Sequence, residues 1–245
     1  MRHIILAAGM GTRLFPTTLD LPKVLLKVGG TTLLSNQVDI SLRFTIITQI
    51  TVVTGYLAEQ INEYIAKLQS NNRVNTVYNE HFTINNPIYS LYVAMPVAYD
   101  EDFMITNGDV YYGQSLMRHF IETSETGITM AISPYRDHSG RAMTVHVSQG
   151  RMVAIYPHAP ERDAYESPGI VVVKGEEARN VFYHSMARLY KRYLGQPHYW
   201  HDILNEAKLE FPIQVQMIGE EAWGEVDTES DLAQVNEARA RIDAN

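Results

Sequence analysis

Apolar residues in the first half of the chain form short runs that alternate with segments of helical spacing. Four such runs predict buried strands, and each is followed by a segment in which apolar residues recur every three or four positions. The strands are expected at 3–8, 49–54, 74–78 and 103–106, and the helices at 32–42, 57–68, 88–95 and 114–122. Pro96 is expected to end the third helix. Alternating strands and helices predict a parallel sheet with right-handed crossovers, covered on both faces.

The pattern changes in the second half of the chain. Closely spaced strands joined by Gly and Pro turns predict a mixed or antiparallel insertion, at 129–133, 143–147, 152–156 and 170–173. Helices at 177–192 and 198–207, a strand at 213–218 and a helix at 231–242 are expected to follow. The sequence contains no internal repeat and no linker. We therefore expect a single α/β domain over residues 1–245, with a small β-rich lid at about 134–170.

Composition and charge narrow the class of partner. The chain has 20 basic and 28 acidic residues in 245 and a net charge of −8, so nucleic acid and anionic membranes are not expected partners. A phosphate must then be bound by a few placed groups or by a metal. No cysteine occurs, which excludes disulfides, thiolate zinc sites and a cysteine nucleophile. The absence of cysteine also fits a reducing compartment, so we expect a cytoplasmic protein. No apolar run reaches about 18 residues, so no membrane insertion is expected.

A glycine-rich turn follows the first predicted strand. Gly9 and Gly11 let the backbone approach a ligand closely, and successive N–H groups in such a turn can form an anion-binding nest. Arg13 is placed to clamp phosphate oxygens, and Lys23 brings a second cation near the same loop. The chain has no P-loop signature, and Leu14 stands where the dinucleotide fingerprint has its third glycine. These residues predict a phosphate-binding loop of another kind.

The segment Leu-Ala-Ala-Gly-Met-Gly-Thr-Arg-Leu at 6–14, with Lys23 ten residues after Arg13, resembles a known family signature. It is that of the nucleoside-triphosphate:phosphate nucleotidyltransferases, which include sugar-1-phosphate nucleotidylyltransferases and cytidylyltransferases for phosphocholine and similar small phosphates. The resemblance covers essentially the whole chain. It implies a three-layer α/β nucleotidyltransferase fold with a mixed, mainly parallel central sheet. It also implies that Arg13 and Lys23 are catalytic, and that the nucleotide contacts Leu6, Ala7, Ala8, Gly9, Gly11, Thr12, Arg13, Asn79, Asn86 and Ser90.

Two acidic residues are candidate metal ligands. Asp109 follows the fourth predicted strand, at the sheet edge where open α/β sheets bind ligands. Taken alone, Asp109 is better explained as a turn residue, and Asp227 as an acid at the start of the last helix, where Thr228 and Asp231 form a capping box. The resemblance implies instead that Asp109 and Asp227 together hold Mg²⁺, with Glu225 as a weaker candidate beside them. Mg²⁺ suits one or two carboxylates plus phosphate oxygens and water.

Two further segments resemble bacterial phosphocholine cytidylyltransferases more than sugar-phosphate enzymes. They are Asn-Asn-Pro-Ile-Tyr-Ser-Leu-Tyr at 85–92 and His-Tyr-Trp-His-Asp at 198–202. Aromatic faces hold a quaternary ammonium group by cation–π attraction, helped by a carboxylate. The alternative is that these aromatic residues pack in the core or at its rim. The resemblance implies that the acceptor contacts Tyr89, Tyr199, Trp200, Asp202 and Glu225.

The implied reaction is Mg²⁺-dependent nucleotidyl transfer. CMP would pass from CTP to a small phosphate or phosphonate such as phosphocholine, with release of pyrophosphate. Within the enzyme class, the alternative is a sugar-1-phosphate nucleotidylyltransferase that uses UTP, dTTP or GTP. A nucleotide-binding sensor without catalysis is the alternative outside that class. The sequence leaves open the acceptor, and it leaves open whether the chain forms a homodimer.

Overall fold

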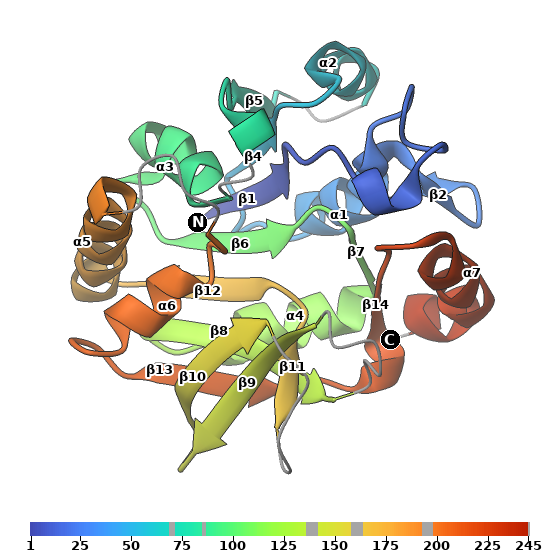
Figure 1. The fold of residues 1–245 in the computed structure, drawn as a ribbon. Helices are drawn as coiled ribbons and strands as arrows, with labels where there is room; N and C mark the ends of the chain where they lie inside the picture. Colours follow the sequence, from blue (N-terminus) through green and yellow to red (C-terminus); the bar gives the residue numbers. More distant parts are fainter. Residues whose placement is uncertain (69–71, 85–86, 136–141, 158–163, 193–197, 245) are drawn as a thin grey trace.

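Ten strands of the described residues form one mixed sheet through the centre of the molecule (Figure 1). The computed structural model describes residues 1–68, 72–84, 87–135, 142–157, 164–192 and 198–244. In spatial order the strands are β11 (Tyr165–Ser167), β9 (Met143–Ser148), β10 (Arg151–Pro157), β13 (Ile213–Met217), β8 (Gly127–Pro134), β12 (Ile170–Lys174), β6 (Phe103–Asn107), β1 (Arg2–Ala7), β4 (Gln49–Thr54) and β5 (Val74–Tyr78).

Parallel pairing holds the N-terminal half of the sheet together. β1 lies between β4 and β6, and β5 follows β4, with all of these pairs parallel. β12 is antiparallel to both β6 and β8, and β13 is parallel to β8. From β13 to β5 the sheet is therefore mixed and mainly parallel, which confirms the predicted fold class.

The remaining strands extend the sheet in antiparallel fashion. β11 pairs with both β8 and β9, and β10 pairs with β9 and, at Arg151 and Gln214, with β13. Because β13 also pairs with β8, these five strands close into a small ring. The antiparallel strands predicted in this part of the chain are thus present. The role of this region as a lid stays a prediction.

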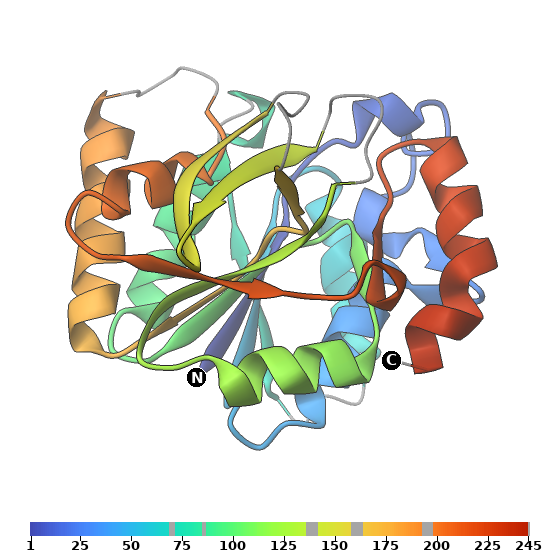
Figure 2. The same ribbon diagram turned by 90° about the horizontal axis from the view of Figure 1, so that it is seen from below.

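Helices cover both faces of the sheet (Figure 2). Neighbouring strand residues point to opposite faces, so that Ile4 packs into one apolar cluster and Ile5 into the other. No helix among the described residues combines the length and the apolar character that a membrane crossing needs. The first face carries α3 (Pro87–Ala98), α5 (Glu176–Arg192) and α6 (Asp202–Ala207), and the second carries α1 (Leu33–Leu42), α2 (Ala58–Ala66) and α4 (Gln114–Thr123).

The last helix, α7 (Glu229–Ala244), lies beside the sheet and begins at a side-chain cap. The Thr228 hydroxyl accepts from the backbone N–H of Asp231 at 3.2 Å, and the Asp231 carboxylate accepts from the N–H of Asp227 at 3.1 Å. Thr228 is thus the predicted N-cap, and it pairs one donor that a helix start leaves unsatisfied. The Asp231 half of the predicted capping box reaches back one residue further than in the standard motif, to the N–H of Asp227 instead of that of Thr228. It fixes the chain direction at Asp227.

Two helix boundaries differ from the prediction by more than two residues. The helix expected to end before Pro96 continues to Ala98, because Met95 and Ala98 stay buried against the core on either side of the exposed proline. The helix expected over 198–207 begins only at Asp202. A carboxylate is favoured in the first turn of a helix, so Asp202 marks a better start than the residues before it.

Several short strands have no counterpart in the sequence prediction. Each is only two or three residues long, which is too short to show a hydrophobic period. The recognisable signal is the Gly29–Gly30 pair, both at positive φ, which suits the tight turn of a hairpin. The strands are β2 (Lys27–Val28), β3 (Thr31–Thr32), β7 (Val110–Tyr112), β11 and β14 (Trp223–Glu225).

Replacing Pro96 by alanine should stabilise the protein. Alanine restores an N–H that can donate to the carbonyl of Tyr92 and removes the clash of the proline ring with that carbonyl. In a helix interior, proline is less favourable than alanine by about 3 kcal/mol of folding free energy. Position 96 lies near the helix end, and alanine leaves the unfolded chain more conformational freedom than proline does. Both effects reduce the gain, so we expect the free energy of unfolding to rise by about 1 kcal/mol. Urea unfolding followed by circular dichroism measures it. An unchanged or lower free energy of unfolding would contradict this expectation.

Candidate active site

The glycine-rich turn leaves the sheet at the carboxyl end of β1. Leu6 and Ala7 end this strand, and the following Ala8 is buried. Gly9 is exposed, and a Cβ at this position would meet nothing within 4 Å. The backbone at Gly9 is therefore open to a ligand, as the phosphate-binding prediction requires.

Gly11 brings Lys23 close to this turn. Its φ of +63° is in the left-handed region that favours glycine, and a Cβ there would lie 3.2 Å from the Cβ of Lys23. The Thr18 hydroxyl donates to the Gly11 carbonyl at 2.8 Å, which holds the loop in this shape. Thr12 and Arg13 follow in a short 3₁₀ turn, η1 (Thr12–Leu14), and both are exposed. Lys23 itself opens a second 3₁₀ turn, η2 (Lys23–Leu25).

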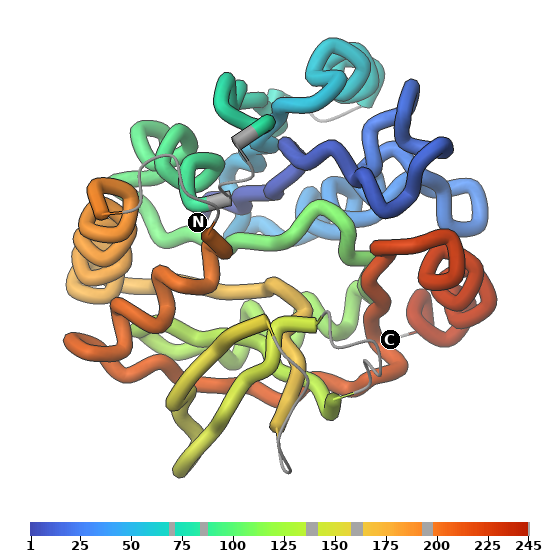
Figure 3. Tube along the Cα trace, viewed as in Figure 1, coloured from blue at the N-terminus to red at the C-terminus, as the bar shows by residue number. Residues whose placement is uncertain are grey.

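A two-stranded sheet brings the two predicted metal ligands together. β7 pairs antiparallel with β14, so that Val110 lies opposite Glu225, and the N–H of Val226 donates to the carbonyl of Asp109 at 3.0 Å. Asp109 precedes β7 and Asp227 follows β14, so both lie at the same end of this small sheet. Figure 3 shows the two segments side by side, although Asp109 and Asp227 are 118 positions apart in the sequence.

Lys23 lies between the two carboxylates. Its Nζ is 2.7 Å from Oδ2 of Asp109 and 2.7 Å from Oδ1 of Asp227, and Arg13 pairs with the other oxygen of Asp227. Only 12 % of the Lys23 side chain is exposed, against 56 % of Arg13. Burial acts to lower the pKa of Lys23, but the two carboxylates outweigh it and raise this pKa above its usual value. Lys23 is therefore a permanent cation at the centre of the site.

Three carboxylates form an oxygen donor set for a metal. One oxygen each from Asp109, Glu225 and Asp227 lies within 4.8 Å of the others. Burial, and then the charges of Asp109 and Asp227, raise the pKa of Glu225 well above its usual value. Oδ1 of Asp109 is buried without a hydrogen-bond partner in the described part of the chain. Oxygen ligands with an unpaired buried member suit a hard divalent cation, so these residues fit the predicted Mg²⁺.

A cavity of about 850 Å³ adjoins Glu225 and Asp227. It lies against β14, α7 and a 3₁₀ turn, η4 (Glu220–Ala222), and seven of the eight charged residues in its described lining are acidic. Such a lining favours a ligand group that carries positive charge. The charged lining residues are Glu166, Glu220, Glu221, Glu225, Asp227, Asp231, Glu237 and Arg241.

The predicted nucleotide contacts beyond the glycine-rich turn lie after β5 and on α3. The Asn79 side chain donates from Nδ2 to the Ser90 hydroxyl at 2.9 Å and accepts from the N–H of His81 at 2.8 Å. Asn79 and Ser90 are both buried, so these groups already pair within the chain. Asn86 lies outside the described residues. A direct contact of Asn79 with a base stays a prediction.

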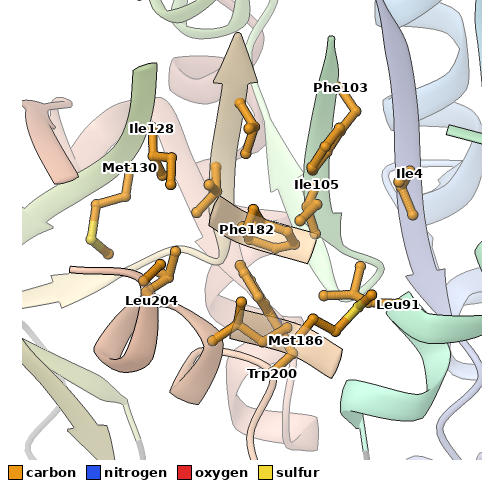
Figure 4. Packing of buried hydrophobic residues seen from close by; sticks show 14 of the residues in the cluster. Ile4, Leu91, Phe103, Ile105, Ile128, Met130, Phe182, Met186, Trp200 and Leu204 are labelled. Atoms are coloured by element: carbon orange, nitrogen blue, oxygen red, sulfur yellow. The ribbon is translucent and has the colours of Figure 1, made fainter. Parts of the chain in front are cut away.

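The predicted acceptor residues lie in different surroundings. Trp200 is 3 % exposed and packs in the core with Phe182 and Met186 of α5 (Figure 4), while its Nε1–H donates to Oδ1 of Asn107 at 2.9 Å. This burial matches the packing alternative for Trp200. Tyr199 is 50 % exposed and precedes α6.

Two other predicted acceptor residues have partners of their own. Asp202 pairs with Nδ1 of His198 at 3.1 Å. The Tyr89 ring lies against His81, with ring centroids 4.6 Å apart, and its hydroxyl donates to Glu80 at 3.4 Å. Glu225 lies with the metal-ligand candidates rather than with these residues.

Side chains that the sequence pattern does not reveal support the Asp109 turn. The Asn36 amide exchanges two hydrogen bonds of 3.1 Å with the backbone of Tyr112. Gln37 donates to the carbonyls of Asn107 and Val110. The available signal is the adjacent pair of amide residues between the apolar residues Leu34 and Val38 of α1.

The variant Glu225→Gln should have a higher melting temperature at pH 7 without divalent ions. Because the folded-state pKa of Glu225 is raised, its ionised form opposes folding at every pH above the unfolded-state pKa near 4.5. Glutamine removes that charge, and we expect a gain of roughly 2–4 °C. Below about pH 4 both states of the parent are protonated, so the two proteins should melt alike. Scanning fluorimetry in EDTA at both pH values measures this. A lower melting temperature of the variant at pH 7 would count against the repulsion.

Comparisons with known proteins identify the family of this chain. A family model described as nucleotidyl transferase matches residues 2–239. The 2-aminoethylphosphonate cytidylyltransferase of Lancefieldella rimae is 25% identical over 232 residues, which cover 94% of this chain and 89% of that protein. The choline-phosphate cytidylyltransferase of Streptococcus pneumoniae is 39% identical over 93 residues, 38% of each chain.

A solved structure shares the fold. The structure of CTP:phosphocholine cytidylyltransferase from Streptococcus pneumoniae matches with a TM-score of 0.79 and 22% identity, and covers 96% of this chain and 97% of that chain. The resemblance stated from the sequence is thus confirmed. Since the family model spans nearly the whole chain, the protein belongs to the nucleotidyl transferase family of enzymes.

Proposed function

We propose that this enzyme transfers CMP from CTP to a small phosphate or phosphonate that also carries an amine or quaternary ammonium group. The observation that carries the proposal is the meeting of Lys23 with Asp109 and Asp227 beside the glycine-rich turn, each Nζ–oxygen distance being 2.7 Å. CTP is inferred from the relatives, since both compared proteins are named cytidylyltransferases. The acceptor class is inferred from the same names and from the acidic cavity.

The reaction is a displacement at phosphorus. An oxygen of the acceptor's phosphate or phosphonate attacks the α-phosphorus of CTP and forms a new P–O bond. The bond from the α-phosphorus to the bridging oxygen of the β-phosphate breaks, and pyrophosphate leaves with that electron pair. Because the attacking oxygen is already an anion at neutral pH, no side chain has to remove a proton. Catalysis then depends on positioning and on charge stabilisation.

The cationic side chains and the turn have separate roles in this proposal. The backbone N–H groups of the turn at Gly9 and Gly11 bind the phosphates. Lys23, nearly buried and always charged, offsets negative charge on the phosphate being transferred. Arg13, which is far more exposed, reaches the leaving pyrophosphate.

The carboxylates hold the cofactor in this proposal. Asp109 and Asp227, with Glu225 beside them, would bind Mg²⁺, which when present neutralises charge on the phosphate oxygens. The unpaired buried Oδ1 of Asp109 supports this assignment. Within the chain itself, Lys23 separates the two aspartates and offsets their mutual repulsion.

The cavity next to Asp227 supports an acceptor with a positive charge. Carboxylates prevail among the charged residues of its described lining, and a sugar phosphate would bring no cation to them. The antiparallel strands β9 to β11 are proposed to act as the lid on the acceptor side, because Glu166 on β11 lines the same cavity. The exposed Tyr199 remains a candidate for contact with a quaternary ammonium group.

Pyrophosphate release in the presence of Mg²⁺ tests the proposed substrates. The common nucleoside triphosphates are crossed with phosphocholine, phosphoethanolamine, 2-aminoethylphosphonate, inositol phosphate, glucose-1-phosphate and mannose-1-phosphate. We expect turnover with CTP and an amine-bearing acceptor, at least roughly 100-fold faster than with the other pairs. Turnover only with a sugar phosphate and another triphosphate would support nucleotidyl transfer but would contradict the proposed acceptor and the use of CTP. Nucleotide binding without any pyrophosphate release would indicate a sensor.

The variant Lys23→Ala should lose turnover while keeping its fold. Removing a cation that stabilises the developing charge lowers kcat by roughly 10²–10³-fold. The matched control is Lys27→Ala, which removes an exposed lysine four positions away and should keep wild-type turnover. Steady-state kinetics with CTP and the best acceptor, together with circular dichroism of each variant, measure the effect. Near wild-type turnover of a folded Lys23→Ala protein would remove Lys23 from the mechanism.

A further inference from the structure

A row of buried polar side chains lies next to the turn that carries Asp109. Its members are fully buried, and they come from three elements: His3 on β1, Thr106 on β6, and Gln37 and Ser41 on α1. Burying four polar groups costs free energy unless each one is hydrogen-bonded. The partners of these side chains therefore show what the row does.

Each side chain in this row donates a hydrogen bond to the next one, in the order Ser41, His3, Thr106 and Gln37. Oε1 of Gln37 accepts from the Thr106 hydroxyl at 2.6 Å, so the hydroxyl oxygen is free to accept in turn from Nε2 of His3 at 2.7 Å. The other ring nitrogen, Nδ1, then carries no proton and accepts from the Ser41 hydroxyl at 2.8 Å. Burial lowers the pKa of His3 to about 3, which keeps the ring neutral near pH 7.

The row determines which way the Gln37 amide points. With Oε1 committed to Thr106, the Nε2 amino group faces the backbone and donates to the carbonyl of Asn107 at 2.9 Å and to that of Val110 at 2.8 Å. A flipped amide would place its oxygen against two carbonyl oxygens. Both donors of the amide are thus used, on the two residues that flank Gly108 and Asp109.

The turn has little other freedom. A Cβ at Gly108 would lie 2.5 Å from the carbonyl oxygen of Leu6 and 2.8 Å from Val24, and the N–H of Gly108 donates to that carbonyl at 2.9 Å. On the far side, Asn36 holds Tyr112. Gln37 is therefore the side chain that ties together the two ends of the segment from which the Asp109 carboxylate projects.

We propose that Gln37 is a positioning residue for nucleotidyl transfer, which holds the Asp109 carboxylate where it meets Asp227 and Lys23. This inference rests on the proposed function, in which Asp109 is a metal ligand. Gln37 contacts neither carboxylate and acts through the backbone of the turn. Groups that orient metal ligands in this way commonly matter nearly as much as the ligands.

The variant Gln37→Met tests this role, because methionine keeps the length of the side chain and removes both donors. We expect kcat to fall roughly 10–100-fold and the Mg²⁺ concentration for half-maximal rate to rise, while KM for CTP stays close to wild type. A second measurement needs neither metal nor substrate: amide hydrogen exchange of the nucleotide-free chain should become faster at residues 108–112. The control is Val38→Ala, a buried apolar neighbour on the same helix, which lowers the melting temperature and leaves exchange in the turn and the Mg²⁺ requirement unchanged.

A second variant tests the same role if the Gln37→Met protein does not fold. Thr106→Val removes the hydroxyl that orients the amide and leaves the amide donors in place, so it should shift kcat and exchange in the same direction by a smaller factor. A folded Gln37→Met protein with wild-type kcat and Mg²⁺ requirement overturns the inference. Turnover by Asp109→Asn with unchanged Mg²⁺ dependence instead overturns the metal assignment of the proposed function, and the positioning role falls with it.

Discussion

The contact of one ammonium group with two carboxylates is the constraint on which the site depends. Lys23, Asp109 and Asp227 come from three distant parts of the chain and are mostly withdrawn from water. Charges in such a place are costly unless each has a partner at hydrogen-bond distance. The positions of the surrounding elements must therefore be accurate, and many local features serve that accuracy. Gly11 admits the Lys23 side chain, the β7–β14 pair sets Asp109 beside Asp227, and the capping box fixes the start of α7.

Different segments of the sequence contribute opposite charges to this site. The N-terminal segment supplies the exposed backbone of the turn and the cations Arg13 and Lys23, which suit the phosphates of a nucleotide. The turn after β6 and the segment before α7 supply the carboxylates, which suit a metal ion. The acidic cavity continues from the carboxylates towards β11. In the proposed function, a single sheet edge thus offers places for a triphosphate, a divalent cation and a positively charged acceptor.

Local sequence was sufficient where one physical preference dominates. The strands β4 and β5 have the predicted bounds, because each is a short run rich in β-branched residues. The capping box at Thr228 was recognisable because its members are three residues apart. Pro96 was misjudged since proline near a helix end costs little when its neighbours remain buried. Trp200 could equally have been a binding residue or a core residue, and only its 3 % exposure distinguishes them.

The sequence by itself determined the family, the class of fold and the residue types of the phosphate-binding turn, because these depend on short motifs and on hydrophobic periodicity. The tertiary structure alone decided that Asp109 and Asp227 meet, since the strands that join them, β7 and β14, are three residues each and leave no period to detect. It alone revealed the hydrogen bonds of Gln37 to the Asp109 turn, since Gln37 lies on a helix far from the turn in sequence and is oriented by hydrogen bonds from His3 through Thr106. Contacts between distant segments are set by packing and by the pairing of buried polar groups, and neither follows from local pattern.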